Sequence, residues 1–255
     1  MSRLLTYFIV ITLFSCRGAS EKAPPSTMSA FDTAKAVVEA EKSDTARPEH
    51  QSIRVEIEQI SAVQFIEASK KANVSDPIVK ITDFGMAQKQ LADVVEFEDY
   101  GEYLGIKKIN FRNGTSSGDK EEFEECSFIA YFPKEDILLC EGGHTIDVSF
   151  DLGTGQGTYE VGNPDLTTVS PNGKYRLNKV FEGQECFYHF IQKKEQTKFS
   201  KVIELGEVFE NKTSKWLCVT EREFWTDDFT LYFGLVIQYK DDGNICEYYK
   251  VKIID

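Results

Sequence analysis

Histidine and basic residues are scarce in this sequence. Its 255 residues include 3 histidines and 29 lysines and arginines against 42 aspartates and glutamates, a formal net charge of −13. A glycine-rich phosphate loop and a His-Glu-x-x-His zinc helix are also missing. These absences argue against a nucleotide-binding enzyme and a zinc protease. Nucleic acid is not an expected partner, because binding to phosphates needs a basic face.

The start of the chain has the features of an export signal. An uncharged, mainly apolar stretch from Leu4 to Phe14 follows Arg3 and is closed by polar sequence that includes Glu21 and Lys22. This stretch is too short to cross a hydrocarbon layer of about 30 Å. A basic start, about ten apolar residues and a small residue before the cut are typical of a secretory signal.

The end of that stretch resembles the lipobox of bacterial lipoproteins. The lipobox places an aliphatic residue three positions before a cysteine and a small residue directly before it. Leu13 and Ser15 fit this pattern before Cys16, while Phe14 is bulkier than the pattern favours. The resemblance implies that residues 1–15 are removed. It also implies that Cys16 carries a diacylglyceryl thioether and an N-acyl chain, which anchor the protein to a membrane.

Arg17 bears on the destination of the chain. In the sorting rule of some bacterial lipoproteins, an acidic residue after the cysteine retains the protein in the inner membrane. Arg17 stands there instead, so the resemblance implies a lipid-anchored protein of the bacterial cell envelope, at the outer membrane. The alternative is an ordinary secretory signal in which Cys16 has no such role.

The composition divides the remaining chain in two. Residues 16–50 are rich in Ala, Ser, Thr, Glu, Lys and Pro, and their few large apolar groups cannot offset the entropy of ordering. We predict a flexible tether here, with an end-to-end distance of roughly 30 to 35 Å. Residues 51–255 are predicted to form a β-rich globular domain.

One short helix is predicted near the start of this domain, at about residues 61–72. Ser61 and Gln64 have the spacing of a capping box. Phe65, Ala68 and Ala72 then form an apolar stripe at helical spacing.

From about Ile78 the hydrophobic period changes to two, which predicts antiparallel strands. Residues 146–152 alternate most clearly, which predicts one face in a core and the other in water. Residues 229–239 are almost continuously apolar and are predicted to be covered on both faces. The other predicted strands are 105–111, 127–132, 137–140, 175–181, 186–192 and 246–253. Asn-Gly or Asp-Gly pairs at 113–114, 172–173 and 242–243 supply tight turns.

Three segments share the order apolar residue, polar turn and strand, namely residues 131–139, 169–177 and 224–233. The stretch from Ser170 to Tyr175, together with the preceding Phe150 to Gly155, resembles WD-repeat and related β-propeller sequences. The resemblance covers about 120 residues, from 130 to 250, and implies a small or partial propeller. The alternative is a β-sandwich or an open antiparallel sheet.

Five cysteines follow Cys16, at positions 126, 140, 186, 218 and 246. In an oxidising compartment one or two disulfides are expected, and sequence alone leaves 15 ways to form two bridges. We favour a bridge between Cys186 and Cys218, which lie in aromatic, strand-like contexts. The alternative is that the cysteines are buried and unpaired. No pair has the short ligand spacing of a zinc site, so no metal or other cofactor is expected.

No catalytic residue is assigned from the sequence. His144 is interpreted as an exposed loop residue, and His189 as a strand-face residue. The leading functional hypothesis is a noncatalytic binding or interaction module, anchored to the membrane, with a protein or glycan partner in the envelope. The alternative is an envelope hydrolase or glycan-processing enzyme whose carboxylates meet only in the fold. Its candidate acids are Glu141, Asp147, Asp151 and Glu185.

Overall fold

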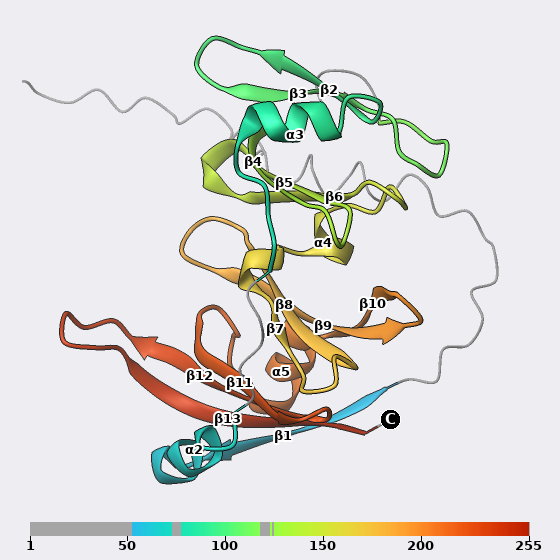
Figure 1. Ribbon diagram of the computed structural model, residues 1–255. Coiled ribbons are helices and arrows are strands. Elements are labelled where there is room, and N and C mark those ends of the chain that lie inside the picture. Colours follow the sequence, from blue (N-terminus) through green and yellow to red (C-terminus); the bar gives the residue numbers. More distant parts are fainter. Residues whose placement is uncertain (1–52, 73–77, 118–122, 124, 255) are drawn as a thin grey trace, which may run out of the picture. The chain divides into compact units, whose positions relative to one another are not determined.

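The computed structural model describes residues 53–72, 78–117, 123 and 125–254 (Figure 1). The predicted signal, Cys16 and the tether lie outside the described residues. The fold is mainly antiparallel β with few helices, as predicted, and it is not a closed propeller. None of the helices in the described ranges is long and apolar enough to cross a membrane.

The first sheet contains the first and last strands of the described chain, and we call it the terminal sheet. Its strand order is β1-β13-β12-β11, and all of its pairs are antiparallel. The strands are β11 (Thr220–Asp227), β12 (Thr230–Gln238), β13 (Ile245–Ile254) and β1 (Arg54–Ile60). Because β1 pairs with β13 from Arg54–Ile254 to Ile60–Tyr248, the two ends of the domain are joined in one sheet.

The second sheet, which we call the middle sheet, is an antiparallel run of four consecutive strands. These are β7 (Thr168–Val169), β8 (Tyr175–Phe181), β9 (Phe187–Glu195) and β10 (Lys198–Glu204). Helix α5 (Leu205–Thr213) follows β10 directly.

The third sheet has five consecutive strands and is called the five-stranded sheet. The strands are β2 (Val95–Asp99), β3 (Leu104–Ile109), β4 (Ser127–Phe132), β5 (Ile137–Glu141) and β6 (Asp147–Asp151). Helix α3 (Phe84–Gln90) packs on it through the buried Ala87. Asp83 caps this helix by accepting a hydrogen bond from the backbone N–H of Met86 at 2.7 Å.

Helix α2 (Ala62–Ser69) matches the predicted capping box. The Ser61 hydroxyl accepts from the Gln64 N–H at 3.3 Å, and the Gln64 side chain accepts from the Ser61 N–H at 2.9 Å. Phe65 packs on the terminal sheet, with its ring centre 5.1 Å from Phe224 and 4.4 Å from Tyr248. The helix ends at Ser69, three residues earlier than predicted.

The main apolar core joins the terminal and middle sheets. Tyr175 and Leu177 of β8 enter it from one sheet, and Trp225 and Phe233 enter it from the other, all fully buried. The Trp225 indole N–H donates to the Thr168 carbonyl oxygen at 2.9 Å, so the largest side chain of the core also leaves no buried donor unpaired.

The middle sheet is buried on its other face as well. Arg176 and Asn178 alternate with the core residues of β8, and they are 3% and 0% exposed. This face meets helix α4 (Thr158–Val161) and the turn between β4 and β5, through hydrogen bonds to the Val161 carbonyl and to Glu135. The middle sheet therefore has one apolar and one polar buried face.

Several predicted elements agree with the structure. Strands β4 and β8 have the predicted bounds, and each of the three similar segments forms an antiparallel hairpin: β4–β5, β7–β8 and β11–β12. The predicted turn glycines 114, 173 and 243 all have positive φ angles. On β12 the predicted burial on both faces holds as far as Leu235, whereas Ile237 is 53% exposed.

The prediction that β6 turns one face to water is wrong. Ser149, on the supposed water face, is fully buried because α4 covers it, and its backbone N–H donates to the Thr158 hydroxyl at 3.0 Å. Strands β1, β2, β10 and β11 were not predicted from the sequence, and one helix was predicted where the described residues contain four α-helices. In β1, Val55 and Ile57 alternate with Glu56 and Glu58, but no strand was predicted before the helix at about residue 61.

The two tryptophans provide a matched test of the core. We expect Trp225→Ala to lower the free energy of unfolding by about 3 to 5 kcal/mol, because it leaves a cavity and an unpaired Thr168 carbonyl. Trp216→Ala should change it by less than about 0.5 kcal/mol, because this side chain is 68% exposed. Urea unfolding followed by circular dichroism measures both, and equal losses would contradict the assigned core.

Candidate functional site

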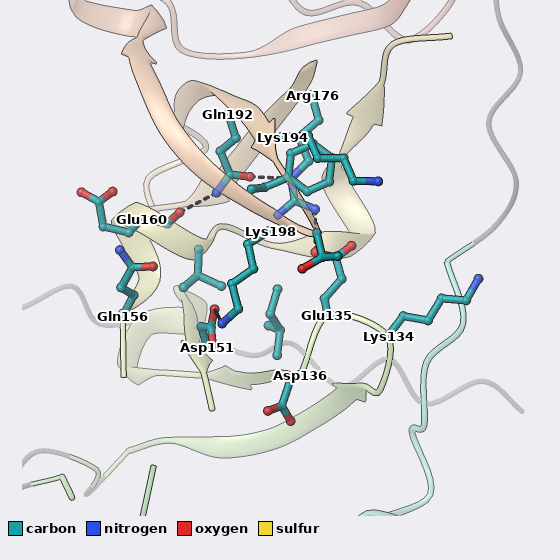
Figure 2. A pocket seen from close by; sticks show the side chains of 14 residues that line it. Lys134, Glu135, Asp136, Asp151, Gln156, Glu160, Arg176, Gln192, Lys194 and Lys198 are labelled. Atoms are coloured by element: carbon teal, nitrogen blue, oxygen red, sulfur yellow. Dashed lines mark hydrogen bonds and ion pairs between the residues drawn. The ribbon is translucent and has the colours of Figure 1, made fainter. Parts of the chain in front are cut away.

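A cleft of about 420 Å³ lies between the middle sheet and the five-stranded sheet (Figure 2). Its first wall belongs to the middle sheet and includes Arg176, Gln192, Lys194, Thr197, Lys198 and Phe199. The opposite wall is formed by the β4–β5 turn, the end of β6 and α4, and includes Lys134, Glu135, Asp136, Asp151, Gln156 and Glu160. Ligand sites commonly have volumes of about 300 to 1,000 Å³, so the cleft is large enough for a small molecule.

Arg176 connects the two walls. Its guanidinium donates to Glu135 at 2.5 Å and to the Gln192 side-chain oxygen at 2.5 Å. It also lies over the Phe199 ring, 4.0 Å from the centre. Burial lowers the pKa of Arg176, and the neighbouring Glu135 acts in the opposite direction. Since arginine stays protonated in proteins, this is a fixed positive charge at the base of the cleft.

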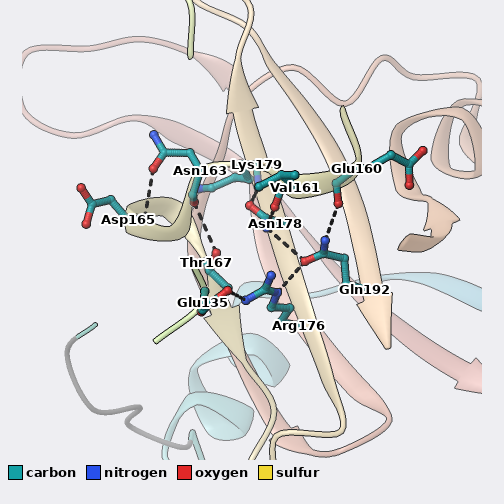
Figure 3. Close-up of polar contacts among 10 residues, drawn as sticks. All are labelled: Glu135, Glu160, Val161, Asn163, Asp165, Thr167, Arg176, Asn178, Lys179 and Gln192. Carbon is teal, nitrogen blue, oxygen red and sulfur yellow. Dashed lines mark hydrogen bonds and ion pairs between the residues drawn. The ribbon is translucent and has the colours of Figure 1, made fainter. Parts of the chain in front are cut away.

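Amide side chains continue the network behind Arg176 (Figure 3). Gln192 donates to the Glu160 carbonyl at 2.6 Å, and Asn178 donates to the Val161 carbonyl at 2.8 Å. Both contacts are to α4, so the middle sheet determines where this short helix lies. Gly162 ends the helix with a φ of +80°, and a Cβ there would lie 2.2 Å from the Asn178 side chain. A larger residue at 162 would therefore break the close approach of α4 to β8.

The carboxylates of the opposite wall are also held in place. Asp136 accepts from Arg112 at 2.8 Å and from the Tyr131 hydroxyl at 3.0 Å. Asp151 accepts from the backbone N–H groups of Gly153 and Thr154, both at 2.8 Å. These contacts leave the cleft with charged groups whose positions are set before any ligand enters.

A second group of charges adjoins the cleft at Glu160. Lys201 lies 3.1 Å from Glu160 and 2.6 Å from Glu204, and Tyr188 donates to Glu204. Burial, followed by the charges of Glu160 and Glu207, raises the pKa of Glu204 to about 6. Lys201 thus holds two carboxylates together beside the rim of the cleft.

The candidate acids of the hydrolase hypothesis do not meet in this cleft. Asp151 lines it, whereas Asp147 and Glu141 are opposite one another in the strand register at the other end of the β5–β6 ladder. Asp147 accepts from the Phe181 N–H at 2.8 Å, and Glu185 lies in the turn before β9. Only one of the four carboxylates is therefore part of the site.

The two histidines among the described residues are placed as interpreted. His144 is exposed in the short 3-10 turn Gly143–Thr145. His189 is buried on β9, where its ring nitrogens contact the Phe187 carbonyl at 2.9 Å and the Thr220 hydroxyl at 3.0 Å. Burial, and then Lys179, lower the pKa of His189 to about 3, so this ring is neutral near pH 7.

Cys186 and Cys218, the pair favoured from sequence, form a disulfide with a Cα–Cα distance of 4.7 Å. The bridge ties the start of β9 to the segment before β11. Cys126 and Cys140 are buried in the core of the five-stranded sheet. In the described part of the chain, no three His, Cys, Asp or Glu side chains are grouped as metal ligands.

No nucleophile elbow was expected from the sequence, yet residues 114–118 match its Gly-x-Ser-x-Gly pattern. That motif needs a serine on a sharp turn from a strand into a helix. Ser116 instead forms an isolated antiparallel bridge with Asn110 in the loop after β3. The pattern therefore does not mark a catalytic serine here.

Most residues of the cleft were not predicted from the sequence. Arg176, Gln192, Lys194 and Lys198 lie on strands or turns that read as ordinary alternating β sequence. A polar residue on such a strand predicts a solvated face, and no short motif distinguishes a buried one. The one signal was the alternation of Arg176 and Asn178 with Tyr175 and Leu177 in β8, next to the segment 170–175 that resembles propeller turns.

The Arg176–Glu135 pair can be tested by removing one partner. We expect Arg176→Met to cost about 3 kcal/mol of unfolding free energy, because it leaves Glu135 without this donor at a largely buried site and removes one of the two donors to the Gln192 side-chain oxygen, the other being Asn178. Arg112→Met is the control: its pair with Asp136 is more open, with the arginine side chain 46% exposed, so the cost should be about 0 to 1 kcal/mol. Adding Glu135→Gln to Arg176→Met should recover part of the loss. Equal losses from the two arginine variants in urea unfolding would contradict the buried network.

The chain matches no protein-family model, no curated protein sequence and no solved structure.

Proposed function

We propose that this chain is a lipid-anchored, noncatalytic binding protein of the bacterial cell envelope. In this proposal residues 1–15 are a signal, Cys16 carries the lipid and residues 16–50 are the tether. The domain from residue 51 onward binds a polar partner in the cleft between the middle and five-stranded sheets. The proposed location is the outer membrane, on the basis of Arg17 after the lipidated cysteine.

The cleft is the observation that carries the binding role. It is lined mainly by charged and polar side chains whose positions are fixed by other contacts, such as Arg176 by Glu135 and Asp136 by Arg112. Prearranged polar groups favour binding because they lose little conformational entropy when a ligand arrives. Most of these groups are already paired, which suits recognition better than proton transfer.

The hydrolase alternative receives less support. A retaining or inverting glycosidase needs two carboxyl groups on either side of the scissile bond, one of them with a raised pKa. The carboxyl group with the clearest rise, that of Glu204, is bound by Lys201 and Tyr188 beside the cleft. We therefore keep the binding module as the proposed function.

The lipid anchor is tested by substitution of its cysteine. We expect Cys16→Ser to abolish incorporation of labelled fatty acid and to release or mislocalise the protein, because the thioether cannot form. Cys246→Ser is the matched control and should keep the label. Unchanged labelling of Cys16→Ser in cells would rule out the anchor.

The cleft is tested in cells with a photoreactive amino acid. Placed at Thr197, an exposed residue of the cleft, it should give a defined adduct with an envelope component, identified by mass spectrometry. The control position is Asp242, which is exposed in the turn between β12 and β13. The same adducts at both positions, or none at Thr197, would count against the cleft as the binding site.

A further inference from the structure

Lys201 of β10 is shared by two carboxylates from different parts of the chain. Its side chain is only 13% exposed, and its ammonium group lies 2.6 Å from Glu204 of β10 and 3.1 Å from Glu160 of α4. The Glu160 carboxylate points away from Asp151 and the other cleft acids (Figure 2). A single ammonium group therefore connects α4, at one wall of the cleft, with the last strand of the middle sheet.

The two carboxylates compete for the same ammonium group. An ammonium group has three N–H donors, and Lys201 also donates to the Tyr188 hydroxyl at 3.1 Å. The Tyr188 hydroxyl in turn donates to Glu204. Aromatic rings enclose the rest of the group, since it lies 5.5 Å from the centre of the Tyr188 ring and 5.7 Å from that of Phe190. A change of charge on Glu204 must therefore alter the pairing of Lys201 with Glu160.

Further carboxylates surround this cluster. Glu207 of α5 adds its charge to those of Glu160 and Glu204. Glu182, which follows β8, is hydrogen-bonded to Tyr159 of α4. The titratable groups around Lys201 thus come from each element packed against it: Tyr159 and Glu160 from α4, Glu182 from the end of β8, Tyr188 from β9, Glu204 from β10 and Glu207 from α5. Like charges this close favour protonation of one carboxylate.

Glu204 is the carboxylate that takes the proton first. Burial, and then the charges of Glu160 and Glu207, raise its pKa from the ordinary 4.5 to about 6. The folded chain therefore binds this proton more tightly than the unfolded chain does. The resulting stabilisation is complete below about pH 4.5 and is lost as the pH rises through about 6. Acidification from pH 7.5 to pH 5.5 thus neutralises most of Glu204 in the folded protein.

We propose that Lys201 is a proton-controlled switch between α4 and β10. When Glu204 is ionised, Lys201 is shared between two carboxylates. When Glu204 takes a proton from water, Lys201 pairs with Glu160 alone and holds α4 more firmly to the middle sheet. Protonation also removes one negative charge beside the cleft, so mild acid makes this wall both more rigid and less acidic. The inference goes beyond the proposed function and does not depend on it.

The first test follows the proton directly. In the full chain, carbon-13 NMR of the Glu204 carboxyl group should give a titration midpoint near pH 6. Glu160→Gln removes a neighbouring negative charge and should lower this midpoint by about 0.5 pH unit or more. Glu210→Gln is the control, because Glu210 is exposed on the same helix as Glu207 and is not among the groups around Lys201. It should move the midpoint by less than about 0.2 unit.

The second test measures how firmly α4 is held. The Gly162 N–H closes this helix by donating to the Thr158 carbonyl at 2.7 Å. Its protection from hydrogen exchange, corrected for the intrinsic effect of pH, should be at least about threefold higher at pH 5.5 than at pH 7.5. Glu204→Gln should give the higher protection at both pH values, and Lys201→Met the lower at both. The Leu152 N–H, which is hydrogen-bonded outside α4, is the internal control and should show no such change.

Either of two results would overturn the switch. One is a Glu204 midpoint near 4.5, or one that Glu160→Gln leaves in place. The other is equal Gly162 protection at the two pH values, or the same pH dependence in Lys201→Met as in the wild type. If Lys201→Met does not fold, the titration with Glu160→Gln decides, because that side chain is 43% exposed. The Thr197 cross-link is measured separately, so the proposed function can hold when the switch fails.

Discussion

The middle sheet is buried on both faces, and only one of these faces is apolar. On β8, Tyr175 and Leu177 enter the core shared with the terminal sheet, while Arg176 and Asn178 face the five-stranded sheet and α4. Buried polar groups are tolerated only when they are hydrogen-bonded. The contacts of this polar face therefore decide where α4 and the β4–β5 turn lie, and the cleft opens at the margin of the same interface.

The cleft thus results from the way in which the polar groups of this interface are hydrogen-bonded. An apolar interface would close completely, because apolar side chains gain most from excluding water. Arg176 and Gln192 instead hold Glu135 and the Glu160 backbone at hydrogen-bonding distance, which keeps charged groups at the margin between the sheets. The charges of Lys194, Lys198 and Asp151 then lie at a boundary with water, where they remain available to a partner.

The sequence predicted local structure well and the polar interface poorly. Strands 127–132 and 175–181 and the Ser61 cap depend on period and capping within short stretches, and the favoured cysteine pair 186–218 was chosen from the aromatic, strand-like context of both residues. The burial of Ser149 and Asn178 depends on α4, which is only four residues long and has no periodic signal. Alternation shows that two faces differ, but it does not show whether the polar face meets water or another polar surface. The pairing of β1 with β13 was missed for a related reason, since it joins segments from opposite ends of the domain.

A buried arginine pair is a costly way to join two sheets, because its charges lose hydration that their attraction only partly restores. The pair fixes the orientation of the two sheets, because a planar guanidinium donates hydrogen bonds only in fixed directions. Apolar side chains allow neighbouring sheets to shift. In this chain the Arg176 guanidinium donates to Glu135 and Gln192 and lies over the Phe199 ring, and these three partners belong to three different segments. Fixing those segments sets the spacing of the two charged walls, and a binding site for a small polar molecule requires such a spacing before the ligand arrives.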